Sequence, residues 1–176
     1  VLLLIPIMLT TQTLWMTGRW LNMTISAIIV LSLYVIIDHS TVKPQGDSDL
    51  WSGLYMATLI MIFARMVLST EPQAPLETTN IVTRYIIYST LLSPIIEEVI
   101  FRQVMYNSLI TQDGNKWPAR IITSLLFIVL HFPTTDIQWI YYTLCTIALQ
   151  TVYEKSDNNL HVAIGYHVLY NLTTLL

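Results

Sequence analysis

Residues 93–102 read Ser-Pro-Ile-Ile-Glu-Glu-Val-Ile-Phe-Arg and place three ionisable side chains in the middle of a long apolar segment. A charged side chain at the centre of a bilayer costs about 2.5 to 3.5 kcal/mol, so such groups are retained where they pair, meet water or carry out chemistry. Glu98 and Arg102 are four residues apart and can pair along one helix face, whereas Glu97 lies about 100° around the helix. The spacing therefore leaves Glu97 available to a functional site.

The composition of the whole chain agrees with a membrane setting. Hydrophobic residues make up 54% and charged residues 11%, with a mean hydropathy of +0.59, whereas soluble domains carry about 25% charged residues. The net charge of -3 supplies no basic stripe, which excludes nucleic acid as a partner. The single cysteine, Cys145, cannot build a disulfide framework or a cysteine metal site. We therefore expect an integral membrane protein surrounded by a lipid bilayer.

Apolar stretches alternate with short polar breaks along the chain, each stretch near the roughly 20 residues that span a bilayer. This pattern predicts an all-α fold, a polytopic transmembrane bundle of about seven helices. The expected helices are 1–17, 21–37, 51–69, 81–110, 118–132, 136–153 and 160–176. No break is long enough for a domain linker, so we expect a single integral-membrane domain over 1–176. The motifs described below lie in its core at 81–176.

Few other polar residues interrupt the apolar segments. His131 ends the apolar run 127–131, while His167 and Asn171 lie four apart in the last segment and can share one face. Arg65, near the end of the third segment, is expected to extend its cationic head to the membrane interface. Pro94 removes one backbone donor three residues before Glu97 and can kink the helix beside the carboxylates.

The residue types support more than one chemistry. A buried Glu97 close to an imidazole can take a proton from water that attacks a carbonyl, while a second imidazole and an amide hold the oxyanion. Alternatively, Glu97, His131 and His167 can bind a divalent metal such as zinc with an open position for water. No serine stands in a nucleophile context, which argues against Ser-His-Asp chemistry. A Glu98–Arg102 bridge can also serve only to join helices.

Three motifs occur in order, each within an apolar segment. They are Glu97-Glu98-x-x-x-Arg102, Phe127-x-x-x-His131 and His167-x-x-x-Asn171. In this respect the chain resembles the CPBP family, also called Abi, which comprises Rce-type CAAX prenyl proteases and bacteriocin-processing or immunity enzymes. The resemblance covers roughly residues 81 to 176, while residues 1 to 80 match only in being hydrophobic helices.

The resemblance implies a helical bundle with an internal polar cavity that acts as an intramembrane endopeptidase on a membrane-associated peptide or protein. The processing would be of CAAX type or of bacteriocin or pheromone type, in a bacterial cell membrane. Within it, Glu97 would be the catalytic base, assisted by His131. His167 and Asn171 would stabilise the oxyanion or complete a metal site. The supporting residues would be Glu98 and Arg102, which orient the site, and Phe127, which packs near it. The family resemblance leaves open whether a metal is required.

Two non-protease readings remain. One is a membrane immunity or regulatory protein of the same family that binds a partner without cutting it. The other is a proton-coupled carrier, since buried Glu and His also form relays. The carrier fits less well, because no pair of corresponding Gly- or Pro-broken helices indicates a repeat.

Overall fold

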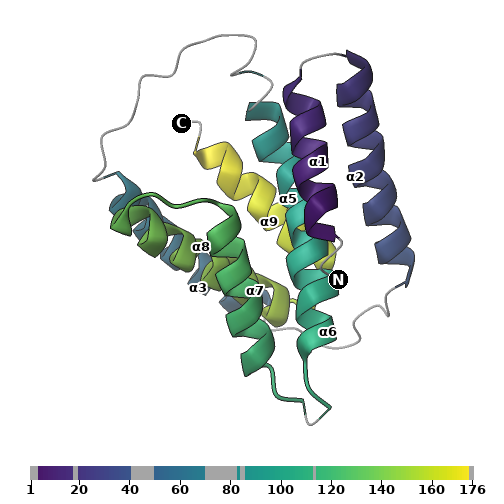
Figure 1. The fold of residues 1–176 in the computed structure, drawn as a ribbon. Helices are drawn as coiled ribbons and strands as arrows, with labels where there is room; N and C mark the ends of the chain where they lie inside the picture. Colours follow the sequence, from purple (N-terminus) through teal and green to yellow (C-terminus); the bar gives the residue numbers. More distant parts are fainter. Residues whose placement is uncertain are drawn as a thin grey trace.

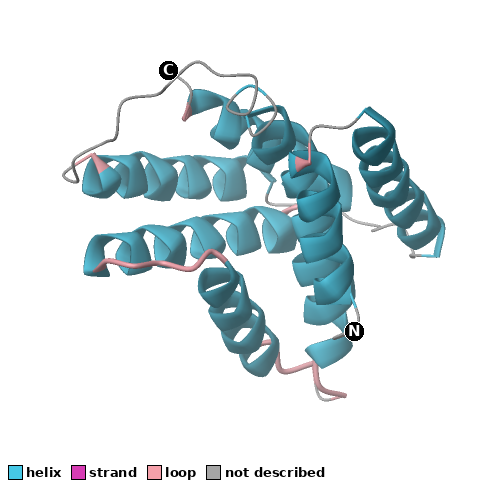
Figure 2. Cartoon of the chain, turned by 45° about the horizontal axis from the view of Figure 1, so that its top comes forward, coloured by secondary structure: helices cyan, strands magenta, loops and turns pink. Residues whose placement is uncertain are grey.

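A computed structural model describes residues 4–17, 20–40, 50–69, 83, 86–112 and 114–174, with backbone only at 20 and 38–40. Every regular element in these ranges is a helix, and no strand occurs among them (Figure 2). The described part of the chain forms seven helices, which confirms the predicted all-α class. The outer ends of several predicted segments, including 1–3, 81–82 and 175–176, lie outside the described residues.

The helices begin and end within a few residues of the predicted bounds. Their ranges are α1 Leu4–Met16, α2 Trp20–Ser40, α3 Leu50–Leu68, η1 Tyr88–Leu92, α5 Ser93–Glu98, η2 Val99–Tyr106, α6 Asn107–Leu109, α7 Trp117–Leu130, α8 Asp136–Lys155 and α9 Leu160–Thr173. The elements from η1 to α6 are turns of one helix, because residues 86–109 are helical without a break.

This long helix contains two stretches of π-helix, η1 and η2, on either side of α5. The Ser93 N–H donates to the carbonyl of Tyr88, five residues back, instead of the usual four. The next residue, Pro94, has no N–H to donate. The helix thus passes through the proline by changing its hydrogen-bond register rather than by ending. Widened turns of this kind rotate the following side chains and occur often at functional sites.

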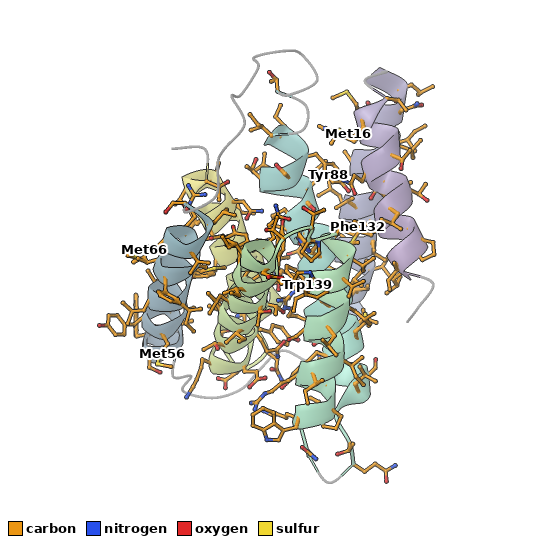
Figure 3. All side chains as sticks on the ribbon, turned by 60° about the vertical axis from the view of Figure 1, so that its left-hand side comes forward. Met16, Met56, Met66, Tyr88, Phe132 and Trp139 are labelled. Carbon is orange, nitrogen blue, oxygen red and sulfur yellow. The ribbon has the colours of Figure 1, made fainter. Side chains whose placement is uncertain are left out.

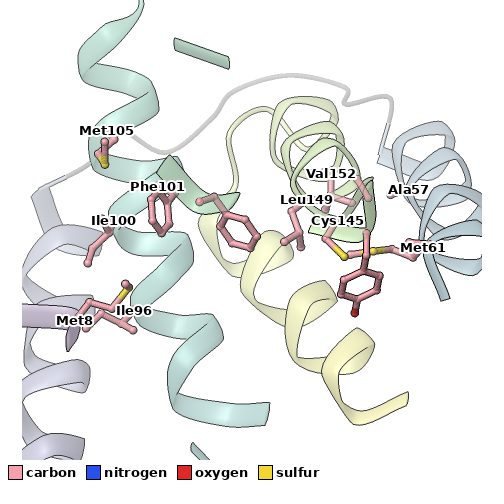
Figure 4. Packing of buried hydrophobic residues seen from close by; sticks show 14 of the residues in the cluster. Met8, Ala57, Met61, Ile96, Ile100, Phe101, Met105, Cys145, Leu149 and Val152 are labelled. Atoms are coloured by element: carbon pink, nitrogen blue, oxygen red, sulfur yellow. The ribbon is translucent and has the colours of Figure 1, made fainter. Parts of the chain in front are cut away.

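The helices pack as a bundle around the long helix (Figure 1). Helices α1 and α2 pair on one side of it, while α3 lies along α8 on the other side. Buried apolar side chains fill the space between them (Figure 4), and those labelled there are Met8, Ala57, Met61, Ile96, Ile100, Phe101, Met105, Cys145, Leu149 and Val152. Small residues lie on the buried face of α3, among them Gly53, Ala57 and Ala64. Small side chains let helix backbones approach closely, as in membrane bundles.

The outer surface of the bundle is strongly apolar. On α3, Met56 and Met66 point away from the other helices (Figure 3) and are 55% and 63% exposed. Within the described ranges, α3 is the one helix long and apolar enough to cross a membrane, and Leu4–Met16, Leu21–Ile37 and Trp117–Leu130 are shorter apolar helices. An exposed apolar face of this extent suits contact with lipid.

The close contact of α3 with α8 makes Gly53 sensitive to substitution. A Cβ added at Gly53 would overlap the Lys155 Cβ, whereas one added at Gly165 in α9 meets no atom within 4 Å. Overpacking of this kind costs about 1–3 kcal/mol, while Ala in a helix is favoured over Gly by about 1 kcal/mol. We therefore expect Gly53→Ala to lower the thermal unfolding midpoint in detergent and Gly165→Ala to maintain or raise it. A midpoint for Gly53→Ala equal to that of Gly165→Ala would contradict the described packing.

Candidate active site

A cavity of about 530 Å³ opens in the bundle, and the polar residues singled out in the sequence gather at its wall. Glu97 from α5, His131 from the end of α7, and His167 and Asn171 from α9 all line it. Arg102 and Glu98, by contrast, lie behind this wall with 1% and 0% exposure. The structure therefore separates the seven candidates into a layer that faces the cavity and a layer that supports it, with Phe127 lining the cavity as well.

The supporting layer is centred on the buried carboxylate of Glu98. Arg102 Nε lies 3.3 Å from Glu98 Oε2, as the four-residue spacing predicts, and His167 Nδ1 lies 2.8 Å from Glu98 Oε1. A carboxylate only accepts hydrogen bonds, so His167 Nδ1 carries the proton. Glu98 thus joins its own helix to α9 and fixes the ring of His167.

Arg102 is held by charge and packing more than by aligned hydrogen bonds. Its Nε makes no hydrogen bond of good geometry to Glu98, and Nη2 donates a long bond of 3.4 Å to Thr146 in α8. Its guanidinium carbon lies 4.9 Å from the centroid of the Phe127 ring. The aromatic face of Phe127 is therefore a further favourable contact for the cation, and it brings α7 against the charged pair.

Glu97, by contrast, faces the cavity. The Ser93 hydroxyl donates a hydrogen bond to Glu97 Oε1, and Glu97 Oε2 lies 3.9 Å from His167 Nε2. This second separation is too long for a direct hydrogen bond. Ser93 was not among the sequence candidates, although its position four residues before Glu97 is the helical spacing that places two side chains together. Ser89, Ser93 and Glu97 follow one another at intervals of four residues, and all three line the cavity.

His131 owes its position to the way α7 ends. Phe132 adopts a left-handed backbone conformation (φ 49°), and the following residue is Pro133, which cannot continue the helix. The His131 ring lies between two aromatic rings, with centroids 4.4 Å from Phe127 and 4.5 Å from Tyr142. Its Nδ1 bonds the Phe127 carbonyl at 2.7 Å. A carbonyl only accepts, so Nδ1 is the donor, and in a neutral ring Nε2 is left as an acceptor.

Asn171 is fixed by a backbone contact from the long helix. Its Nδ2 donates to the Ser89 carbonyl at 2.8 Å. This bond uses one of the two amide hydrogens and leaves the other, with Oδ1, for a ligand. Sequence reasoning could not find Ser89 as the partner, because the two residues lie in different segments of the chain.

The site does not form a ready metal centre. In the part of the chain that the structure describes, no group of three His, Cys, Asp or Glu side chains is close enough to hold a metal ion. The predicted set of Glu97, His131 and His167 shares a cavity, yet the Phe127 ring packs against both imidazoles, with its centroid 4.4 Å from that of His131 and 6.4 Å from that of His167. In this arrangement the three residues therefore do not fit a zinc site.

Comparison with known proteins gives one match. The family model described as Rce1-like, type II CAAX prenyl endopeptidase, matches residues 79–173, more than half of the chain and all seven candidate residues. No curated protein and no solved structure matches.

The buried pair makes Arg102 a structural requirement. Replacement by Ala leaves the Glu98 carboxylate without its permanent cation, and breaking a buried pair in this way costs about 3–5 kcal/mol. We expect Arg102→Ala to lower folded yield and thermal midpoint sharply. The double variant Glu98→Gln with Arg102→Met removes both charges and should recover part of the loss. Normal stability of Arg102→Ala would contradict the role given to the pair.

Proposed function

The chain belongs to the Rce1-like family of type II CAAX prenyl endopeptidases, and from this premise we propose that it is an intramembrane endopeptidase using water activated by Glu97. Its substrate is a membrane-associated peptide or protein, of CAAX type, as the family match favours. The observation that carries the proposal is that Glu97, His131, His167 and Asn171 line one cavity. Peptide hydrolysis inside a bundle needs water held in such a polar pocket, because lipid supplies none.

Activation of water is assigned to Glu97 and His131. Glu97 reaches the cavity as a carboxylate that Ser93 holds through Oε1, so Oε2 is free to accept a proton from water. In its neutral form His131 presents an unprotonated Nε2, since Nδ1 donates to the Phe127 carbonyl. Both groups are therefore acceptors, which is what orienting and deprotonating a water molecule requires.

Stabilisation of the oxyanion is assigned to His167 and Asn171. Glu97 and Glu98 carry two negative charges and Arg102 one positive charge, so a protonated His167 makes this buried cluster neutral. A protonated ring donates Nδ1–H to Glu98 and keeps Nε2–H for the substrate. Together with the second amide hydrogen of Asn171, it supplies two donors for the oxygen that becomes negative in the tetrahedral intermediate.

The complete reaction adds one water molecule across the peptide bond and regenerates Glu97. The water oxygen bonds to the scissile carbonyl carbon as Glu97 takes the proton, and the carbonyl oxygen becomes the oxyanion held by His167 and Asn171. The carbon–nitrogen bond breaks when Glu97 returns the proton to the leaving nitrogen. The products are a carboxylic acid and an amine, which become a carboxylate and an ammonium by proton transfer, and Glu97 is again ionised.

Replacement of Glu97 by Gln removes the proton acceptor and nearly preserves the shape of the side chain. Because general base catalysis contributes about 10²–10⁴-fold, we expect Glu97→Gln to lower cleavage of a farnesylated CAAX-type peptide at least about 100-fold with an unchanged thermal midpoint. Purified protein in detergent is assayed by mass spectrometry of the products. Asp136→Asn, an exposed carboxylate at the start of α8, is the matched control and should retain full activity.

Two outcomes would oppose this proposal. Undiminished cleavage by Glu97→Gln would remove Glu97 as the base. Loss of wild-type cleavage with a chelator, restored by zinc, would replace the metal-free scheme, which predicts that the chelator has no effect. Binding of the peptide without cleavage by the wild type would instead favour the non-catalytic, regulatory role.

A further inference from the structure

Arg65 of α3 stands on the cavity wall, outside the residues that the family match covers. The sequence places it near the end of an apolar segment, where we expected the head group to reach the membrane interface. The structure places Arg65 on the cavity side of α3. Met61, Arg65 and Leu68 recur at helical spacing and all line the cavity, whereas Ile62, Phe63 and Met66 on the outer face are 54%, 56% and 63% exposed.

The cavity therefore contains a fixed positive charge. Among the described residues that line it, Arg65 is the one Lys or Arg, because Arg102 lies buried behind the wall. Arg65 is half-buried and takes part in none of the ion pairs recorded between described residues. A guanidinium in a membrane-enclosed cavity is costly unless it meets water or an anion. A ligand that brings an anionic group would supply the missing partner.

Two tyrosines share the cavity wall with Arg65 and with the candidate catalytic residues. Tyr170 of α9 lines the same cavity as Arg65, and its hydroxyl donates to Tyr141 at 3.0 Å. Tyr170 lies beside Asn171 in the sequence and one helical turn beyond His167, and all three line the cavity. One continuous wall thus carries a cation, two phenol groups and the proposed oxyanion donors.

From this arrangement we infer that Arg65 binds the C-terminal α-carboxylate of the substrate while the scissile bond lies at Glu97. The inference rests on the proposed function and names the feature by which the substrate is recognised. A CAAX sequence stands at the very end of its protein, so its binding brings a free carboxylate into the cavity. Arginine matches a carboxylate with two parallel hydrogen bonds, which Lys cannot reproduce. Arg65 is a specificity-determining residue and takes no part in the transfer of protons.

The test compares two farnesylated CAAX-type peptides of one sequence, one ending in a free carboxylate and the other in an amide. We expect the wild type to prefer the carboxylate peptide about tenfold or more in kcat/KM, mainly through KM, as a charged hydrogen bond allows. Arg65→Gln should lower cleavage of the carboxylate peptide to the level of the amide peptide and leave the amide peptide unaffected. Lys116→Gln, an exposed cation before α7, is the matched control and should keep the full preference.

Two additional variants keep the outcome decisive. Arg65→Lys retains the charge and should keep only part of the preference, which also serves if Arg65→Gln yields no folded protein. Binding of both peptides is measured by fluorescence anisotropy in the Glu97→Gln variant, with Arg65 intact and with Arg65→Gln added. This measurement reports recognition without turnover, and only the protein that retains Arg65 should bind the carboxylate peptide more tightly than the amide peptide.

The outcomes separate the two claims. A wild type that cleaves both peptides equally, or an Arg65→Gln variant that keeps the preference, would overturn the inference while Glu97-dependent cleavage upholds the proposed function. A wild type that cleaves neither peptide would overturn the proposed function, and binding to Glu97→Gln that ignores the terminal carboxylate would overturn the inference.

Discussion

The structure depends on one buried negative charge, the carboxylate of Glu98. It is fully enclosed by the bundle, and such a charge is tolerable only with close partners. Arg102 supplies the permanent cation from the same helix, and His167 supplies a hydrogen bond from α9. The Phe127 ring beside Arg102 brings α7 to the same point. Three helices that are distant in the sequence are thereby fixed around one carboxylate.

The same constraint orders the groups that face the cavity. Because Glu98 holds His167 through Nδ1, the ring can turn only Nε2 toward Glu97 and the cavity. The Phe127 carbonyl fixes His131 in the corresponding way. Two histidines that look alike in the sequence thus receive different tasks in the proposed mechanism, one as an acceptor toward water and the other as a donor toward the oxyanion. The difference comes from the charge of their neighbours: two carboxylates lie beside His167, whereas His131 Nδ1 donates to a neutral carbonyl.

The sequence could predict what is local. Helix positions follow from the apolar periodicity, and the Glu98–Arg102 pair follows from the four-residue spacing, which is why both appear in the structure. The Ser93–Glu97 contact has the same spacing and was within reach. The bond between His167 and Glu98 joins residues 69 positions apart, and no spacing rule connects them.

Two further features could not be predicted from the sequence, for other physical reasons. The π-helical turns around α5 change which backbone groups are bonded, and the apolar pattern does not record this, although Pro94 indicates where a donor is missing. The sequence also could not show that Arg65 lines the cavity, because the direction of a face on α3 is decided by its packing on α8. The expected position of the Arg65 head group at the membrane interface stays a prediction.

In the proposed mechanism Glu97 activates water and does not itself attack the peptide. A single turnover in water enriched in ¹⁸O, with enzyme in excess over the CAAX-type peptide, tests it directly by mass spectrometry of both product and protein. Activation of water by Glu97 predicts that the new carboxylate of the product carries the label and that Glu97 does not. Label in Glu97 with an unlabelled first product would instead show a covalent intermediate and contradict the role of Glu97 as a general base.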